Sequence, residues 1–241
     1  MALLSLHGVS KSYGALKVTN DISLAVEAGE TLGILGPIGA GKTTLFNLIS
    51  GDVRGDAGRV EYDGRDVTRF APHRRCRSGI GRSYQVPQPF GAMTVFENLV
   101  TAACFGGGEP ERQAWKTACA VLEQTGLAAQ ANRPAASLRL LDRKRLELAR
   151  ALATKPKLLL LDEIAGGLTE HEARELVGEL ARIKASGVTM VWIEHVVHAL
   201  LALADRLFVI NFGAKLAEGE PQSVMTNPDV QRVYMGLEAV A

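Results

Sequence analysis

Two kinds of hydrophobic pattern alternate along this chain, and their order predicts an α/β protein. Short continuous or alternating apolar runs, which are typical of strands, occupy residues 3–9, 22–26, 31–35, 59–62, 158–161, 188–193, 206–210 and 215–218. Apolar residues at helical spacing predict helices at residues 44–50, 111–126, 138–153, 170–186 and 196–204. A further helix is expected to begin after Thr94, because Glu97 follows at the spacing of a capping box.

The distribution of these elements predicts a single domain of 241 residues with an insertion. Residues 1–91 and 156–220 form its α/β core, with a β portion at the N-terminus. Residues 92–155 read as an inserted helical subdomain, and residues 221–241 as short C-terminal helices. Between residues 73 and 91 the chain has no clear period, and Pro87 and Pro89 disfavour regular structure there.

A glycine-rich loop stands between the apolar run 31–35 and the helix expected from residue 44. It has the form G-x-x-x-x-G-K-[ST], and its backbone N–H groups and the helix N-terminus would bind the phosphates of a nucleoside triphosphate. Lys42 would reach the β- and γ-phosphates, and the Thr43 hydroxyl would ligate Mg2+. The residues expected at the nucleotide are Gly36, Pro37, Ile38, Gly39, Ala40, Gly41, Lys42, Thr43 and Thr44. A glycine-rich turn with a chance lysine would lack these flanking elements.

Two adjacent carboxylates, Asp162 and Glu163, close the most apolar run of the chain. A buried parallel strand would place them at the carboxyl edge of the sheet, where α/β proteins bind ligands. Asp162 is then expected to hold Mg2+, and Glu163 to polarise an attacking water.

Composition and charge indicate the general class of the protein and bear on its partners. The chain has 27 basic and 26 acidic residues, a formal net charge of +1, and 47% hydrophobic residues. This predicts a packed globular protein with no nucleic-acid partner. The basic run from His73 to Arg77 lacks interleaved aromatics and reads as a solvated face or a subunit contact.

The cysteines and the apolar runs bear on location. Cys76, Cys104 and Cys119 are dispersed and predict reduced thiols rather than a disulfide framework or a zinc site. The N-terminus does not have the pattern of a signal peptide, and no apolar run approaches the length that spans a bilayer. Any membrane segment is therefore expected from another subunit.

Further motifs follow the order found in one large family. The run Leu146–Leu152 precedes the strand that ends at Asp162, and Glu194 and His195 follow a third apolar run. Together with the glycine loop and the acidic pair, these motifs span essentially the whole chain. The sequence resembles the ATPase subunit of an ABC transporter, which implies a P-loop fold with an antiparallel β subdomain and a helical subdomain.

The resemblance implies roles for three more residues. Tyr13 would stack on adenine, Gln85 would contact Mg2+ and the attacking water, and His195 would hydrogen-bond the γ-phosphate as a catalytic residue. Taken alone, each has a plainer explanation: a turn aromatic, a surface amide and a structural histidine. These assignments therefore rest on the resemblance.

The chain departs from the family pattern at two places. Where the family carries L-S-G-G-Q, this sequence has Leu138–Asp142, with Arg139 in place of the serine and leucines in place of both glycines. We expect Arg139 to bind the nucleotide of an opposing subunit, since a helix N-terminus and an arginine both favour an anion; its bulk could instead prevent close approach. Thr169 stands where the family often has aspartate.

Residues 79–85 and 227–236 resemble the branch of the family that imports branched-chain amino acids, urea or amides. This implies an ATPase, peripheral on the cytoplasmic face of the bacterial inner membrane, that works with ATP and Mg2+. Its expected partners are transmembrane permease subunits, a second like or unlike ATPase subunit and, indirectly, a periplasmic solute-binding protein. The alternatives are a soluble ABC ATPase without a transport role and a regulatory subunit with weak hydrolysis.

Overall fold

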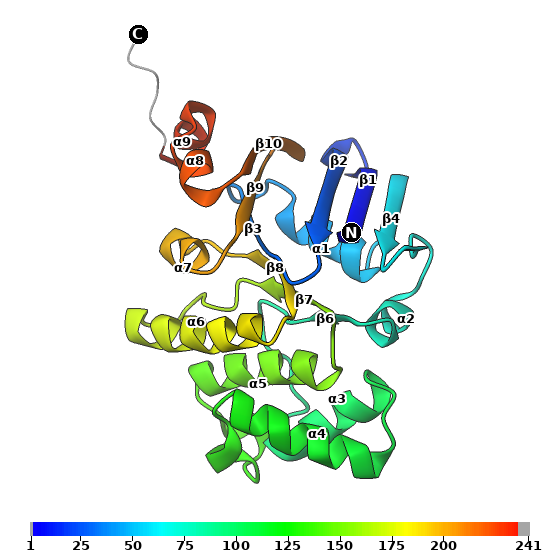
Figure 1. Cartoon of the computed structure of the whole chain (residues 1–241), viewed down its shortest axis with the longest axis vertical. Coiled ribbons are helices and arrows are strands. Elements are labelled where there is room, and N and C mark those ends of the chain that lie inside the picture. Colours follow the sequence, from blue (N-terminus) through cyan, green and yellow to red (C-terminus); the bar gives the residue numbers. More distant parts are fainter. Residues whose placement is uncertain (1, 236–241) are drawn as a thin grey trace. The chain divides into compact units, whose positions relative to one another are not determined.

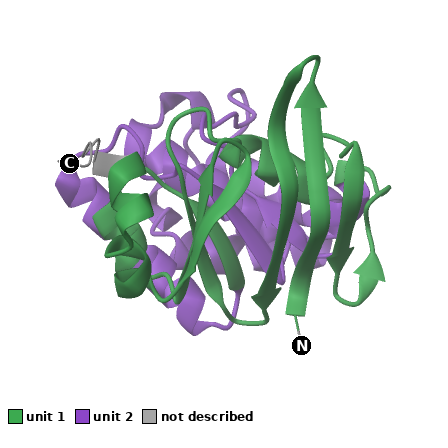
Figure 2. Cartoon of the chain, turned by 90° about the horizontal axis from the view of Figure 1, so that it is seen from above, with its two compact units in different colours: residues 1–72, 189–241 green, residues 73–188 purple. Residues whose placement is uncertain are grey.

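Buried parallel strands and a separate antiparallel sheet organise the chain in the computed structural model, which describes residues 2–235 (Figure 1). The chain divides into two units, one made of residues 1–72 and 189–241 and the other of residues 73–188 (Figure 2). The helical subdomain predicted at residues 92–155 is based on the change from strand to helical patterns and stays a prediction.

An antiparallel sheet in unit 1 has the strand order β2-β1-β4-β5. These strands are β1 (Ala2–Tyr13), β2 (Leu16–Glu27), β4 (Ala57–Tyr62) and β5 (Arg65–Asp66). The first two form a hairpin far longer than the apolar runs 3–9 and 22–26 predict, because shifts in register absorb irregular residues within it. Gly8 (φ 60°) and Asp21 (φ 54°), predicted to lie at or near strand ends, are part of this hairpin.

A second group of strands in unit 1 has the order β10-β9-β3-β8. Strand β3 (Thr31–Leu35) pairs in parallel with β8 (Thr189–Ile193) and β9 (Arg206–Asn211), and β10 (Ala214–Gly219) is antiparallel to β9. Every residue of β3 and β8 is buried, as their continuous apolar sequences predict. The helices of this unit are α1 (Lys42–Ser50), α7 (Val197–Leu201), α8 (Pro221–Met225) and α9 (Pro228–Met235). The last six residues of the predicted C-terminal segment, 236–241, lie outside the described residues.

Unit 2 combines two parallel strands with a group of packed helices. Strand β6 (Ile80–Arg82) pairs with β7 (Leu158–Asp162), all of whose residues are buried. Helices α3 (Val95–Phe105), α4 (Glu111–Gln124) and α5 (Leu140–Ala153) contact one another through apolar faces. Helix α6 (Glu170–Ala185) and two short 3-10 helices, Ala128–Gln130 and Ala135–Ser137, complete the unit.

Local signals in the sequence account for where several helices begin. Thr94 caps α3, and both hydrogen bonds of the predicted capping box with Glu97 are present. Helix α5 begins after Arg139 rather than at residue 138, because Leu138 is extended at the end of a 3-10 turn. Helix α2 (Pro72–Arg77) lies in the segment predicted to be open. Its proline occupies the first helical position, where a missing N–H costs nothing.

Candidate nucleotide site

The phosphate loop of unit 1 follows the buried strand β3 and turns sharply into α1. Gly39 and Gly41 both have a left-handed backbone, with φ of 80° and 102°. A Cβ on Gly36 would lie 2.4 Å from the carbonyl oxygen of Ile210, and one on Gly41 would lie 2.3 Å from that of Val18. The loop therefore needs glycine at both ends, since neighbouring backbone leaves no room for a side chain.

Lys42 is the first residue of α1 and points back into this loop. It is only 6% exposed, and its Nζ donates to the carbonyl oxygens of Gly36 at 2.7 Å and Pro37 at 2.9 Å. Thr43 is exposed beside it, and Thr44 is half-buried. A buried ammonium, an exposed hydroxyl and a helix N-terminus converge here, which is the chemistry that a polyphosphate requires.

Two more expected residues of unit 1 are accessible at the ends of strands. Tyr13 closes β1 with 49% of its surface exposed, and Lys11 places its Nζ 5.5 Å from the centroid of the tyrosine ring. His195 is exposed just after β8. The buried carboxylate of Glu194 accepts the backbone N–H of His195 at 2.9 Å and so shapes the turn that presents the histidine.

In unit 2 the structure joins two residues that the sequence separates by 78 positions. The side-chain amide of Gln85 donates to a carboxylate oxygen of Glu163 at 2.6 Å. Glu163 itself has φ 47°, an uncommon left-handed conformation for a residue with a side chain. The preceding Asp162 is buried at the end of β7, and its Oδ2 accepts a hydrogen bond from Nη2 of Arg82, 3.0 Å away. Asp162, Glu163 and Gln85 thus form one polar group at the carboxyl ends of β6 and β7.

Sequence reasoning missed two cations of this polar group. Arg82 stacks on Tyr84, with 4.7 Å between its guanidinium carbon and the ring centroid, and pairs with Asp162. Lys144, on α5, donates to the main-chain oxygens of Gln85 and Glu163. A lysine inside a helical pattern ordinarily indicates an exposed position, so the sequence carries no signal for its burial.

Arg139 occupies the N-cap position of α5, is exposed, and makes no side-chain capping bond. Arg143, one turn further on, donates to the carbonyl oxygens of Leu138 and Ala136 instead. Asp142 in the first turn lies 3.5 Å from Arg145. Arg143 thus braces the turn before α5, whereas the exposed side chain of Arg139 does not cap the helix.

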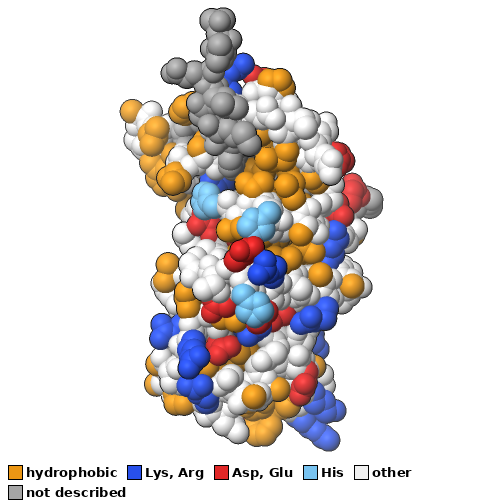
Figure 3. Space-filling view, turned by 90° about the vertical axis from the view of Figure 1, so that its left-hand side faces the viewer, with side chains coloured by type: hydrophobic (Ala, Val, Ile, Leu, Met, Phe, Trp, Pro, Cys, Tyr) orange, Lys and Arg blue, Asp and Glu red, His pale blue; other side chains and the backbone are white. Residues whose placement is uncertain are grey.

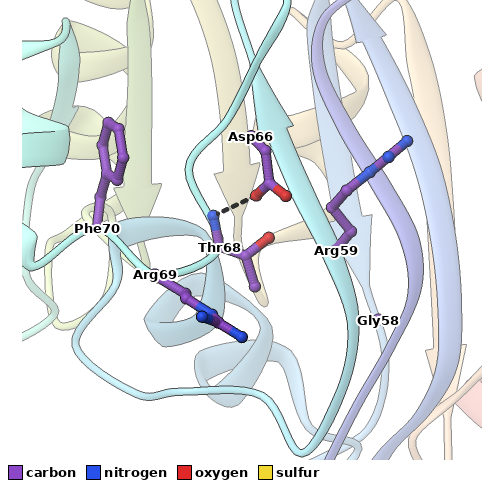
Figure 4. Close-up of a pocket in the computed structure, with 6 residues that line it drawn as sticks. All are labelled: Gly58, Arg59, Asp66, Thr68, Arg69 and Phe70. Carbon is purple, nitrogen blue, oxygen red and sulfur yellow. Dashed lines mark hydrogen bonds between the residues drawn. The ribbon is translucent and has the colours of Figure 1, made fainter.

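A separate hollow of about 630 Å3 lies beside β4 and β5 in unit 1 and is lined by Gly58, Arg59, Asp66, Thr68, Arg69 and Phe70 (Figure 4). Asp66 accepts the backbone N–H of Thr68 at 2.8 Å, and the hydroxyl and N–H of Thr68 hold the pKa of Asp66 below its usual value. None of the residues that line it belongs to the expected nucleotide site.

Acidic and basic side chains are interspersed on the face drawn in Figure 3, in keeping with the near-balanced composition. Within residues 2–235, no helix combines the length and the apolar character that crossing a membrane requires.

Known proteins resemble this chain over nearly its full length. The family model described as "ABC transporter" matches residues 19–166. A probable ABC transporter ATP-binding protein of Azorhizobium caulinodans is 39% identical over 236 residues, covering 98% of this chain and 83% of that protein. The high-affinity branched-chain amino acid transport ATP-binding protein BraF of Pseudomonas aeruginosa is 34% identical, covering 97% of this chain and 98% of that protein.

The fold comparison agrees with the sequence comparison. A solved structure described as the ADP conformation of MJ1267, an ATP-binding cassette of an ABC transporter, matches with a TM-score of 0.88 at 32% identity, covering 98% of this chain and 99% of the other. The chain belongs to the ABC transporter family and is an ATP-binding, ATP-hydrolysing subunit. The predicted α/β fold with its antiparallel sheet is confirmed.

Proposed function

We propose that this chain hydrolyses ATP to power the import of branched-chain amino acids or a related small polar solute. The observation that carries the solute class is the similarity to BraF over 97% of the chain. The loop that holds Lys42 and the bond between Gln85 and Glu163 support hydrolysis rather than nucleotide binding alone.

Each expected residue has a role in this proposal. The N–H groups of residues 36–44 and the ammonium of Lys42 bind the phosphates, while the ring of Tyr13 stacks on the adenine. Glu163, oriented by Gln85, accepts a proton from the attacking water, and His195 donates a hydrogen bond to the γ-phosphate.

The residues proposed to hold Mg2+ offer the oxygen atoms that this ion prefers. They are the exposed hydroxyl of Thr43, the carboxylate of Asp162 and the amide oxygen of Gln85, whose amide nitrogen donates to Glu163. When bound, Mg2+ would neutralise charge on the β- and γ-phosphates.

The proposal also includes partners. As in the family that it resembles, the chain would work at the cytoplasmic face of the bacterial inner membrane, with permease subunits and a second ATPase subunit. A periplasmic binding protein would deliver the solute. In such a pair, Arg139 would contact the phosphates bound by the opposing subunit.

Replacement of the proposed base tests the reaction. In the assembled complex, Glu163→Gln should leave ATP binding within about twofold of the original and reduce phosphate release by about 100-fold or more, because general-base catalysis contributes 10²–10⁴. Full turnover in this variant would exclude Glu163 as the base. A complex that binds ATP but does not hydrolyse it, even with Glu163 present, would favour the regulatory alternative.

Solute uptake is tested separately. Proteoliposomes that hold the complex should accumulate radiolabelled leucine, isoleucine or valine when ATP and the binding protein are supplied, and the Glu163→Gln complex should not. Hydrolysis without uptake of any of the three would point to a different solute.

A further inference from the structure

Lys144 is a buried lysine whose ammonium lies between the two residues proposed to orient the attacking water. The residue is only 4% exposed, in the second turn of α5. Its Nζ donates to the main-chain oxygen of Gln85 at 2.8 Å and to that of Glu163 at 3.2 Å. Burial of an ammonium is costly unless it is hydrogen-bonded, so these bonds are part of what keeps the side chain inside.

The three residues form a closed ring of hydrogen bonds. Gln85 and Glu163 are joined through their side chains at 2.6 Å, and Lys144 joins them again through their main-chain oxygens. The side-chain bond alone would leave both backbones able to shift. With the lysine in place, a shift of either backbone must break a charge-assisted hydrogen bond.

The backbone of Glu163 is the part of this ring that most needs support. Its φ of 47° lies in a region that residues with a Cβ adopt only where the surroundings hold them. Two donors meet its carbonyl oxygen: the N–H of Gly166 at 3.1 Å and the Nζ of Lys144. The lysine therefore acts on the peptide group that aims the carboxylate.

Further side chains on one face of α5 hold the loop that follows β6 and contains Gln85 and Gln88. Residues 144, 147 and 150 share this face at a spacing of three. Arg150 donates to the carbonyl oxygen of Gln88 at 2.9 Å and to Glu147 at 2.9 Å. Burial raises the pKa of Glu147, while Arg150 and backbone N–H groups of the loop oppose that shift. The side chains of α5 contact main-chain oxygens of the loop, so the side chain of Gln85 can bond Glu163.

We propose that Lys144 is a positioning residue for ATP hydrolysis, which holds the backbones of Gln85 and Glu163 together so that the carboxylate stays aimed at the attacking water. The inference rests on the proposed role of Glu163 as the base. Lys144 would also connect the start of α5 to Glu163, because it lies five residues from Arg139, about 7.5 Å along a helix. Movement of the start of α5 would reach Glu163 through this ammonium.

The test compares Lys144→Met with Lys144→Arg in the full chain, assembled with its partner subunits. Methionine keeps the length but removes the donors, and we expect kcat to fall by about 100-fold, the effect of a misplaced catalytic group. The Kd for a fluorescent ATP analogue should stay within about twofold, since the phosphate loop is unchanged. Arginine retains donors, and its kcat should fall by less than about tenfold. Lys116→Met, at an exposed lysine of α4, is the matched control and should match the unmodified complex.

A second comparison separates positioning from general support of the fold. In the Glu163→Gln background, single-turnover hydrolysis should fall by less than about threefold when Lys144→Met is added, because the carboxylate that the lysine aims is already gone. Equal losses in both backgrounds would overturn the proposal, as would normal turnover of Lys144→Met in an otherwise unmodified complex. If thermal unfolding shows that Lys144→Met does not fold, Lys144→Leu, which also lacks the donors, takes its place in both comparisons.

Failure of this inference differs from failure of the proposed function. Normal hydrolysis in Lys144→Met, with hydrolysis lost in Glu163→Gln, rejects the role of the lysine alone. Normal hydrolysis in Glu163→Gln rejects the role of the base, and the inference with it.

Discussion

Gly39 and Gly41 of the phosphate loop share a left-handed backbone but differ in what surrounds them. A Cβ on Gly41 would lie 2.3 Å from the carbonyl oxygen of Val18, whereas one on Gly39 would have nothing within 4 Å. Gly39→Ala should therefore cost only the conformational penalty, about 1–2 kcal/mol. Gly41→Ala should cost at least about 1 kcal/mol more, because backbone must also move.

Urea denaturation of the two variants provides the measurement, with ATP affinity as a second readout. Gly41→Ala should also lose more than about tenfold in ATP affinity, since the shift falls where phosphates bind. Equal unfolding free energies for the two alanine variants would show that the close approach to Val18 does not affect stability.

The sequence carries local signals for the expected site residues but none for the residues that support them. Lys42, Asp162 and Glu163 stand at fixed distances from strand ends, and that is a local pattern. The contacts of Lys144 and Arg82 depend on which turn of a helix faces which loop, which is a property of tertiary packing. The bonds of the buried Lys144 to main-chain oxygens leave no mark in a single sequence.

At the scale of elements, Thr169 can fill the structural role that the aspartate common in the family would have. It is the N-cap of α6, where its hydroxyl accepts the N–H of Glu172 at 3.3 Å and Glu172 accepts the N–H of Thr169 at 2.8 Å. Aspartate and threonine both cap helices well, so Thr169→Asp should leave stability nearly unchanged. Thr169→Ala should lower the unfolding free energy by about 1 kcal/mol. Chemical denaturation of the full chain measures both, and equal losses in the two variants would contradict the capping role.

The pH dependence of this cap has a definite sign. The N–H and hydroxyl of Thr169 hold the pKa of Glu172 below its usual value. A carboxyl whose pKa is lowered on folding stabilises the folded state above its unfolded pKa, and loses that effect as pH falls through the folded pKa. The stability difference between the original chain and Thr169→Ala should therefore be constant near pH 7 and shrink below about pH 4.3. A difference that grows in acid would contradict the assignment.

Periodicity predicted the long elements and failed where irregular residues interrupt them. The buried strands β3, β7 and β8 and the helices α4 and α6 are where their apolar patterns indicate. The β1–β2 hairpin extends beyond its apolar runs because bulges accommodate Gly8 and Asp21. Strand β6 was missed because three residues, one of them glycine, give no period to detect.

At the scale of the whole molecule, the order of motifs carried the family assignment, while the proposed solute class rests on the resemblance of residues 79–85 and 227–236 and on a relative. Each motif alone is a short pattern, but a phosphate loop, an acidic strand end and a histidine after a further strand occur here in one order along the chain. The residues that bind phosphate do not contact the solute in the proposed complex. Solute specificity would therefore reside in the permease and the binding protein, and the similarity to BraF is what bears on it.

Arg139 gives a prediction in which stability and activity should move in opposite directions. An exposed arginine at the N-cap of α5 places a positive charge at the positive end of the helix dipole and supplies no capping oxygen. Arg139→Ser adds a good N-cap and should raise the unfolding free energy by about 0.5–1 kcal/mol. If Arg139 contacts the phosphates bound by the opposing subunit, ATP turnover of the assembled complex should nevertheless fall by at least about tenfold.

Arg112→Ser, at an exposed arginine of α4, is the matched control and should change neither quantity. Unchanged or increased turnover in Arg139→Ser would show that the arginine is not a catalytic contact, and a loss of both stability and turnover would show that it supports the fold.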